Sequence, residues 1–191
     1  MPTNQTIFYA TSNHGKFDEV ARYLAENAPE IELKQLDCDL AEIQTDDQKK
    51  IAAYKAFQAY ELCNAPLLLD DAAIYFTKYN NFPGTYAKQV SQGIGMQGLL
   101  KLMNPGDTAY FKLTMMYANN EGNLYEFEGR CDGTIVHPKD FSAHPQLPYD
   151  AIFKPNGSQK TYAEMRHTKE EAKYSYRIQA LQKFLEWYKN Q

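Results

Sequence analysis

The sequence predicts an α/β protein, and its most informative run is residues 65–71 of the 191-residue chain. This run carries continuous apolar residues into two adjacent carboxylates, Asp70 and Asp71. Continuous apolar runs are typical of parallel strands that are covered on both faces. Short runs of this kind alternate with helical stripes in the first half of the chain, which favours helices packed against a sheet. We expect residues 65–71 to be a buried strand that ends at a ligand-binding edge.

Composition and charge narrow the class of protein. With 43% hydrophobic residues, the chain has enough apolar side chains for one domain spanning residues 1–191, with room for two lobes. The formal net charge of −4 gives no broad basic surface, so nucleic acid is not expected as a partner. The net charge does not exclude a local basic pocket for one small anion.

The cysteines and the apolar segments indicate the compartment. Cys38, Cys63 and Cys131 are widely spaced and form no C-x-x-C pair, which predicts neither a disulfide framework nor a zinc site. The start of the chain has no signal-like pattern, and no run approaches the ~20 apolar residues of a membrane-spanning helix. We expect a cytoplasmic protein that does not associate with membranes.

The first half of the chain is expected to hold three strands and two helices. Residues 6–10 and 31–36 read as strands. A second helix is expected to begin after the capping residues 45–47 and to end near Leu62. The first helix places its apolar stripe at Phe17, Val20, Ala21 and Leu24, and the second at Ile51, Tyr54, Phe57 and Leu62.

The second half begins with residues 74–76, which continue extended structure to a turn at 80–84. Short helical segments are expected within 85–102, and a turn at 104–107 opens a hairpin of strands 108–117 and 124–127. A separate strand at 133–136, a loop at 137–148 and a final helix at about 169–188 complete the chain. The final helix has its apolar face at Tyr174, Ile178, Leu181, Leu185 and Tyr188.

The polar loop at residues 11–16 is a candidate anion site. A strand that ends here and opens a helix directs free backbone N–H groups at one point, and Lys16 adds a positive charge. The loop matches neither the Walker pattern nor G-x-G-x-x-G. The alternative is that Ser12 or Asn13 is a plain helix cap.

Three acids and one lysine are candidates for metal and phosphate binding. Glu42, Asp70 and Asp71 supply the carboxylates that Mg²⁺ prefers, and it typically uses one or two of them with water and substrate phosphate. Successive strand residues point to opposite faces, so Asp70 and Asp71 cannot have the same role. Lys55 is a further candidate phosphate ligand. The alternatives are an acidic strand-to-loop turn at 70–71 and solvated side chains at Glu42 and Lys55.

Aromatic and basic residues near the C-terminus are candidates for stacking on a base. Tyr149 lies beside Asp150, and residues 175–177 read Ser-Tyr-Arg. With 15 tyrosines in the chain, core packing is the alternative for each of them. His14, His137, His144 and His167 have no metal-ligand spacing and are interpreted as loop residues.

The order of these segments resembles the inosine triphosphate pyrophosphatase family over nearly the whole chain. The resemblance implies an elongated α/β fold with a long mixed sheet, flanking helices and two lobes around a central cleft, in a homodimer. It implies Mg²⁺-dependent hydrolysis of deaminated purine nucleoside triphosphates, such as ITP, dITP and XTP, to monophosphate and pyrophosphate. The segments that carry it are residues 11–20, 69–71, 82–86, 129–136, 149–157, 161–165, 175–177 and 180–181.

The resemblance also implies roles for individual residues. Glu42 and Asp71 become metal ligands, Asp71 also orients or deprotonates the attacking water, and Asp70 supports it. Lys16 and Asp71 are the implied catalytic residues. The implied substrate contacts are Thr11, Ser12, Asn13, His14, Gly15, Lys16, Lys55, Asp70, Ala72, Tyr149, Asp150, Glu171, Tyr176 and Arg177.

The departures from the family pattern gather where the family reads the base. Leu147 and Pro148 replace an aromatic residue and a glycine, and residues 72–73 replace Ser/Thr-Gly. Glu171 replaces a lysine, and Tyr176 replaces a histidine. We expect a nucleoside triphosphate pyrophosphatase with altered or relaxed base preference. The alternatives are a nucleotide-binding protein without turnover and a Maf-type pyrophosphatase of modified pyrimidine nucleotides.

Overall fold

The computed structural model describes residues 5–138, 148–166 and 168–191. The chain divides into two compact units, each described here by itself. The first comprises Met1–Asp71, Leu113–Gly129 and Arg177–Gln191, and the second comprises Ala72–Lys112 and Arg130–Tyr176. Strands β3, β5 and β6 (Leu67–Phe76, Thr108–Ala118 and Leu124–Ile135) each contribute residues to both units.

The strands form one mixed sheet. Their order is β2-β1-β3-β5-β6-β7, and β4 pairs with β3. β1 is parallel to β2 and β3, whereas β4 and β7 are antiparallel to β3 and β6. The predicted α/β class, with a mixed sheet and flanking helices, is confirmed. The remaining strands are β1 (Gln5–Ala10), β2 (Ile31–Leu36), β4 (Phe82–Gly84) and β7 (Phe153–Pro155).

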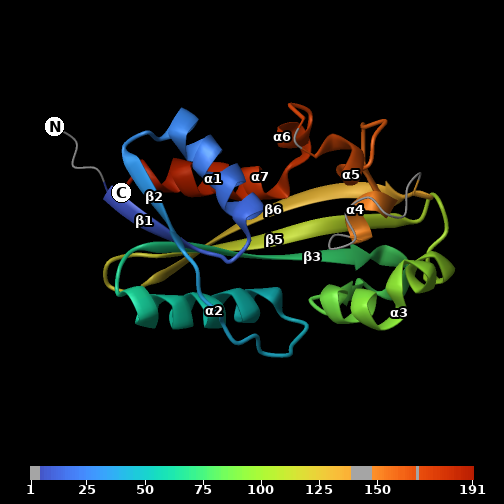
Figure 1. Cartoon of the computed structure of the whole chain (residues 1–191), viewed down its shortest axis with the longest axis horizontal. Helices are drawn as coiled ribbons and strands as arrows, with labels where there is room; N and C mark the ends of the chain where they lie inside the picture. The colour runs from blue at the N-terminus through green and yellow to red at the C-terminus, as the bar shows by residue number, and fades with distance from the viewer. Residues whose placement is uncertain (1–4, 139–147, 167) are drawn as a thin grey trace. The chain divides into compact units, whose positions relative to one another are not determined.

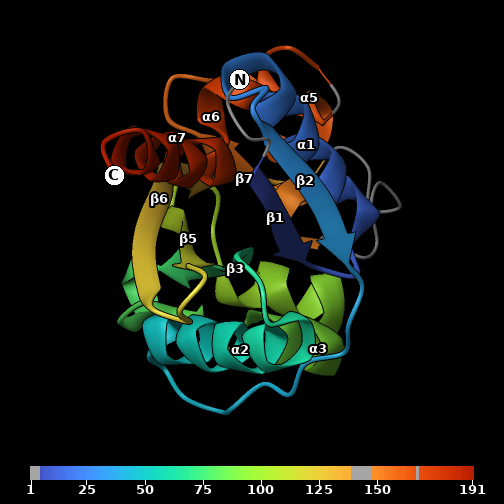
Figure 2. The same ribbon diagram turned by 90° about the vertical axis from the view of Figure 1, so that its left-hand side faces the viewer.

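Helices cover both faces of the sheet in the first unit. Helices α1 (His14–Asn27) and α7 (Tyr176–Tyr188) lie on one face, and α2 (Gln48–Cys63) lies on the other, as the two views in Figures 1 and 2 agree. Asn13 and Asp47 cap α1 and α2 with their side chains. Because α2 faces the opposite side from α1 and α7, neighbouring residues of β3 meet different helices.

The predicted apolar side of α2 is wrong. Ile51 is buried as predicted, but Tyr54, Phe57 and Leu62 are 43%, 58% and 64% exposed. The helix instead packs its small residues on the sheet, where they contact Leu67, Leu69 and Met116. A face of small side chains lets the helix approach the strands closely. The alanines of this face are Ala52, Ala56 and Ala59, each fully buried.

Three predicted boundaries also differ from the structure. Strand β3 does not end at Asp71 but runs to Phe76, and residues 133–135 belong to the long strand β6. The predicted helix at 169–188 is broken at Ser175, whose extended backbone (ψ 113°) separates α6 (Glu171–Tyr174) from α7. Its apolar face is confirmed on α7, where Ile178, Leu181 and Leu185 are buried.

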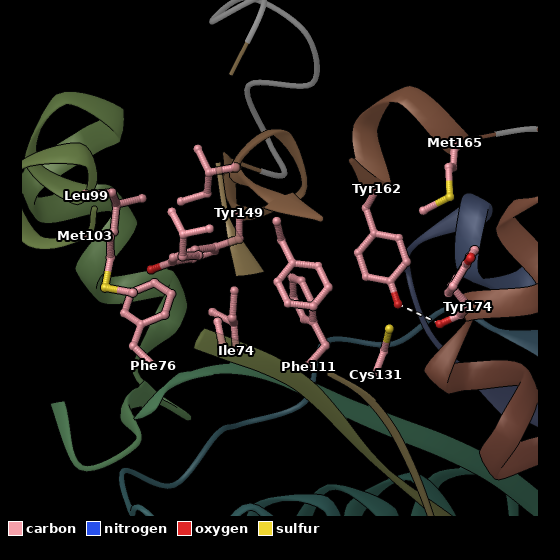
Figure 3. Close-up of a cluster of buried hydrophobic side chains, with 14 residues drawn as sticks. Ile74, Phe76, Leu99, Met103, Phe111, Cys131, Tyr149, Tyr162, Met165 and Tyr174 are labelled. Atoms are coloured by element: carbon pink, nitrogen blue, oxygen red, sulfur yellow. Dashed lines mark hydrogen bonds between the residues drawn. The ribbon is translucent and has the colours of Figure 1, made fainter. Parts of the chain in front are cut away.

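The second unit has an aromatic core between its strands and short helices. Phe111 contacts Phe153 edge-on and stacks on Tyr176, and Ile74 and Phe76 of β3 join the same cluster (Figure 3). The helical segments predicted within 85–102 are confirmed as α3, whose Gly95 has a left-handed φ of 61° that interrupts the helix. The other elements are α3 (Ala87–Leu102), α4 (Pro148–Ile152), α5 (Tyr162–Met165) and the 3-10 turn Thr77–Tyr79.

The histidine and loop predictions have mixed outcomes. His14 is the first residue of α1 rather than a loop residue, whereas His137 lies in a loop. His144, His167, Leu147 and most of the loop predicted at 137–148 lie outside the described residues. Within the described ranges, none of the helices is long and apolar enough to cross a membrane.

Candidate active site

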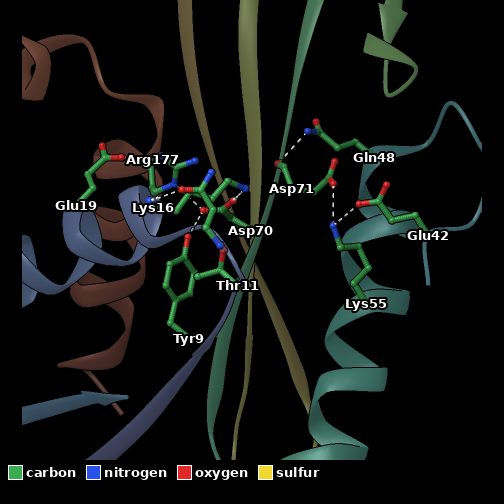
Figure 4. Close-up of polar contacts among 11 residues, drawn as sticks. Tyr9, Thr11, Lys16, Glu19, Glu42, Gln48, Lys55, Asp70, Asp71 and Arg177 are labelled. Atoms are coloured by element: carbon green, nitrogen blue, oxygen red, sulfur yellow. Dashed lines mark hydrogen bonds and ion pairs between the residues drawn. The ribbon is translucent and has the colours of Figure 1, made fainter. Parts of the chain in front are cut away.

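Asp70 and Asp71 sit in the middle of β3 and point to opposite faces of the sheet (Figure 4). Asp70 faces α1 and α7, and Asp71 faces α2. The prediction that the two acids have different surroundings is therefore confirmed, although the strand continues past them. Each acid is the centre of its own polar cluster in the first unit.

Three side chains donate hydrogen bonds to Asp70. Lys16 Nζ lies 2.7 Å from Oδ1, Arg177 Nε lies 2.6 Å from Oδ2, and the Tyr9 hydroxyl also donates to Oδ2. Arg177 extends the cluster through Nη1, which lies 2.6 Å from Glu19 Oε2. The cluster thus joins β1, α1, β3 and α7.

The charge of Asp70 is fixed by these partners. Its side chain is 1% exposed, and burial alone would raise the pKa of the carboxyl group. The positive charges of Arg177 and Lys16 outweigh the burial and hold this pKa well below its usual range. Asp70 is therefore a permanent anion at neutral pH, and it has no proton to exchange in a reaction.

The cluster around Asp71 contains a lysine between two carboxylates. Lys55 Nζ of α2 lies 2.7 Å from Glu42 Oε1 and 3.4 Å from Asp71 Oδ1. Gln48, which is 2% exposed, donates to the Asp71 carbonyl oxygen at 3.0 Å and fixes this part of β3 against the start of α2. The structure thus brings together Glu42, Lys55 and Asp71, which the sequence analysis groups as candidates for metal and phosphate binding.

The electrostatics of Asp71 differ from those of Asp70. Burial raises the pKa of the Asp71 carboxyl group, Lys55 and Lys16 oppose this, and the net shift is upward. Burial would lower the pKa of Lys55, but the charges of Asp71 and Glu42 raise it. Asp71 is therefore the carboxylate of the pair with a raised affinity for a proton.

The carboxylates of Glu42 and Asp71 both contact the ammonium group of Lys55. Two carboxylates placed in this way also suit a divalent metal ion that takes its other ligands from water and substrate. Mg²⁺ typically takes one or two protein carboxylates and completes its shell with water and phosphate oxygens. Glu42 and Asp71 supply that number. Among the described residues, no group of three or more His, Cys, Asp or Glu side chains that could hold a metal ion is found.

The loop before α1 combines a helix cap with the candidate anion site. The Asn13 side chain accepts from Lys16 N at 3.1 Å, and Thr11 Oγ1 accepts from Asn13 N at 3.1 Å. Asn13 is therefore the cap. Ser12, Asn13, His14 and Gly15 are exposed at the positive end of the α1 dipole, which leaves them accessible to an anion.

The candidate base-contacting residues lie in the second unit, except Arg177. Tyr149 is 7% exposed and donates to the Ala87 carbonyl oxygen at 2.8 Å, and Asp150 is 4% exposed. Tyr176 is half-buried and stacks on Phe111, with 5.2 Å between the ring centroids. Glu171 is half-buried at the start of α6, and Ala72 is exposed on β3.

Four residues in these clusters were missed by the sequence interpretation. They are Tyr9, Glu19, Gln48 and Arg166. Arg166 pairs with Asp150 through Nε at 2.8 Å and through Nη2. Tyr9 lies two residues before the candidate loop, and this position could have identified it as a candidate from the sequence. The partners of Glu19 and Asp150 are 158 and 16 residues away in the sequence, and no local pattern marks such pairs.

Fold and polar clusters together define an α/β protein with charged sites on both faces of its central strand. The model of the Ham1 family matches residues 7–187, and the chain belongs to this family. A dITP/XTP pyrophosphatase of Methanopyrus kandleri is 34% identical over 186 residues, covering 96% of each chain. An inosine triphosphate pyrophosphatase of Trypanosoma cruzi is 34% identical over 183 residues, covering 94% of this chain and 90% of the relative.

Solved structures of the family have the same fold. A HAM1 protein of Coxiella burnetii superimposes with a TM-score of 0.77 at 22% identity, covering 98% of this chain and all of the other. The Ham1 protein of Staphylococcus aureus gives a TM-score of 0.74 at 24% identity, covering 95% and 98%. At these identities the likeness establishes the fold.

Proposed function

We propose that the protein hydrolyses non-canonical purine nucleoside triphosphates to the monophosphate and pyrophosphate. The observation that carries this proposal is the position of Lys55, held between the carboxylates of Glu42 and Asp71. Cations and carboxylates at one place suit a metal-bound polyphosphate. The names of the relatives, dITP/XTP and inosine triphosphate pyrophosphatase, support the same substrate class.

The proposed phosphate-binding groups are the exposed N-terminus of α1, Lys16 and Lys55. Glu42 and Asp71 would hold Mg²⁺, which would supply a Lewis acid to offset the charge that develops on the leaving pyrophosphate. Lys55 already occupies the space between these two carboxylates and can move its ammonium group toward a phosphate oxygen, because its stem is flexible.

Asp71 is the proposed general base. Its carboxylate is half-buried beside Lys55 and would accept the proton of a water molecule attacking the α-phosphorus. Gln48 holds the backbone of Asp71, which limits the positions of the carboxylate. Asp70, with its lowered pKa, has no part in proton transfer and acts by orienting the cations around it.

Recognition of the nucleotide base is where we propose that this protein differs from the family pattern. Tyr149, Asp150, Glu171, Tyr176 and Arg177 would contact the substrate. Glu171 replaces a positive charge by a negative one, which disfavours a carbonyl acceptor on the base. The burial of Tyr149 and the Arg166–Asp150 ion pair support an altered or relaxed base preference.

A nucleotide panel with separate detection of pyrophosphate and phosphate tests the proposal. ITP, dITP, XTP and the ordinary triphosphates are assayed with Mg²⁺, and pyrophosphate is the expected product. Asp71→Asn is expected to lower kcat by a factor of about 10² to 10⁴, the range for loss of a general base. Asp18→Asn, a change on the exposed side of α1, is the matched control and keeps full activity.

Other outcomes would refute the proposal. Release of single phosphate from each active substrate contradicts pyrophosphohydrolysis. Triphosphate binding without turnover indicates a nucleotide-binding protein, and selective turnover of modified pyrimidine triphosphates indicates the Maf-type activity.

The metal, the oligomer and the compartment are separate parts of the proposal. Chelation of divalent ions is expected to abolish turnover, and Mg²⁺ is expected to restore it.

A homodimer is expected in sedimentation, supported by the exposed apolar side chains of Tyr54, Phe57 and Leu62 on α2. A cytoplasmic location is expected in cell fractionation.

A further inference from the structure

We propose that Tyr9 is a positioning residue that sets the direction of the Lys16 ammonium group through Asp70. The inference rests on the proposed function, because it assigns the effect to phosphate binding by Lys16. Tyr9 lies at 0% exposure on β1, and its hydroxyl donates to Oδ2 of Asp70. The phenol contacts no solvent, so it acts on a ligand only through its neighbours.

The hydrogen bonds around Asp70 divide between its two oxygens. Oδ2 accepts from Tyr9 and from Arg177 Nε, whereas Oδ1 accepts from Lys16 Nζ at 2.7 Å. Two donors on Oδ2 from different elements fix the rotation of the carboxylate. The direction of Oδ1, and with it the resting place of the ammonium group, follows from that rotation.

Asp70, which anchors the ammonium group, and Lys16, which carries it, differ in their solvent exposure. The Asp70 side chain is 1% exposed, and the Lys16 side chain is 30% exposed. Asp70 therefore cannot meet a ligand directly, but Lys16 can. Within the part of the chain that the structure describes, Asp70 takes one of the three N–H donors of the ammonium group, which leaves the others for phosphate oxygens.

The phenol is suited to this position because it adds a donor without adding a charge. Lys16 and Arg177 already balance the charges of Asp70 and Glu19. Burial and the neighbouring carboxylate raise the pKa of Tyr9 well above its ordinary value, so it stays a donor at neutral pH. A phenylalanine would fill the same space and remove this donor alone.

Tyr9→Phe tests the inference through substrate affinity. The KM for the best triphosphate of the panel is expected to rise about threefold to tenfold, since the hydrogen bond ends on a charged group and part of its energy reaches the substrate. The expected kcat stays within about a factor of two, because Lys55 and Gln48, the hydrogen-bond partners of Asp71, stay in place. Tyr117→Phe is the control, since Tyr117 is 3% exposed in the same unit and its hydroxyl pairs with Tyr188.

A double-mutant cycle separates positioning from general stabilisation. In a Lys16→Met background, Tyr9→Phe is expected to leave KM unchanged, because the group that it positions is gone. Equal KM increases in both backgrounds would overturn the inference. So would a loss of thermal stability in Tyr9→Phe with an unchanged KM, which indicates a structural role only.

Binding of inorganic tripolyphosphate distinguishes this inference from the proposed function. Calorimetry is expected to show a Kd about threefold to tenfold weaker for Tyr9→Phe, with Tyr117→Phe equal to the wild type. If no nucleotide is hydrolysed but this difference is found, the proposed function fails and the inference stands. If the wild-type protein binds no tripolyphosphate, Lys16 is not a phosphate ligand and the inference fails.

Discussion

Asp70 remains ionised inside the protein because two cations and a phenol surround it. Removing the charge leaves Arg177 and Lys16 facing a neutral group, and loss of one partner from a buried ion pair costs ~3–5 kcal/mol. We expect Asp70→Asn to lower the free energy of unfolding by about 3 kcal/mol in urea at pH 7 with chelator present. Asp132→Asn, which breaks the exposed pair with Arg130, should change it by less than about 1 kcal/mol.

Acid should reduce the difference in the free energy of unfolding between the wild type and Asp70→Asn. The folded-state pKa of Asp70 is lowered, so its stabilising charge is fully present above the unfolded-state pKa of about 3.9 and is lost as the pH falls from there toward the folded-state pKa. Urea titrations of the two proteins between neutral and acidic pH measure this. A difference that is constant with pH would mean that the charge of Asp70 is not the stabilising feature.

At the residue scale, the alternation of a strand was enough to predict that Asp70 and Asp71 face different surroundings. It was not enough to identify their partners. Arg177 lies 107 residues from Asp70, and Lys55 lies 16 residues from Asp71 on a different element. Such pairs depend on how the elements pack, which no local pattern records.

At the scale of elements, α2 shows why the spacing of large apolar residues predicted the wrong buried face of the helix. Large apolar side chains predict the buried side when a helix packs at ordinary distance, but here alanines face the strands. We expect Ala56→Leu to lower the free energy of unfolding by ~1–3 kcal/mol, because the buried site has no room for the added atoms. Phe57→Gln on the exposed side should change it by about 0.5 kcal/mol or less. Measuring the monomer at low concentration excludes any contribution from association.

The break at Ser175 separates α6 from α7 and gives Glu171 a short helix of its own. Glu171 acts electrostatically on Arg166, whose guanidinium pairs with Asp150. If the negative charge of Glu171 weakens the reading of a purine carbonyl, Glu171→Lys should raise the kcat/KM ratio of ITP over ATP by about tenfold, or ~1.4 kcal/mol. Lys173→Glu, a change of equal size at an exposed residue of α6, is the control. An unchanged ratio in Glu171→Lys would remove Glu171 from base selection.

At the scale of the whole molecule, strands β3 and β6 were the elements that sequence patterns divided incorrectly, whereas β5 was predicted to within one residue. Turn residues and carboxylates suggested ends at Asp71 and before Gly133, but the ladder continues through both. Both strands cross these positions without a break, so the tertiary context outweighs the local signals. Both compact units therefore share three strands of the same sheet.

Shared strands predict that the two units unfold as one. The only tryptophan of the chain, Trp187, lies in the first unit, so its fluorescence reports on that unit alone. Phe153→Ala empties a fully buried site in the second unit and should cost ~3–5 kcal/mol. In one cooperative transition this cost appears in the Trp187 signal, and the urea midpoint from fluorescence falls together with that from circular dichroism. A control with a similar cost in the first unit is Phe184→Ala, at 0% exposure. If Phe153→Ala leaves the Trp187 midpoint unchanged while the circular dichroism transition splits, the units unfold separately and the continuous strands do not couple them.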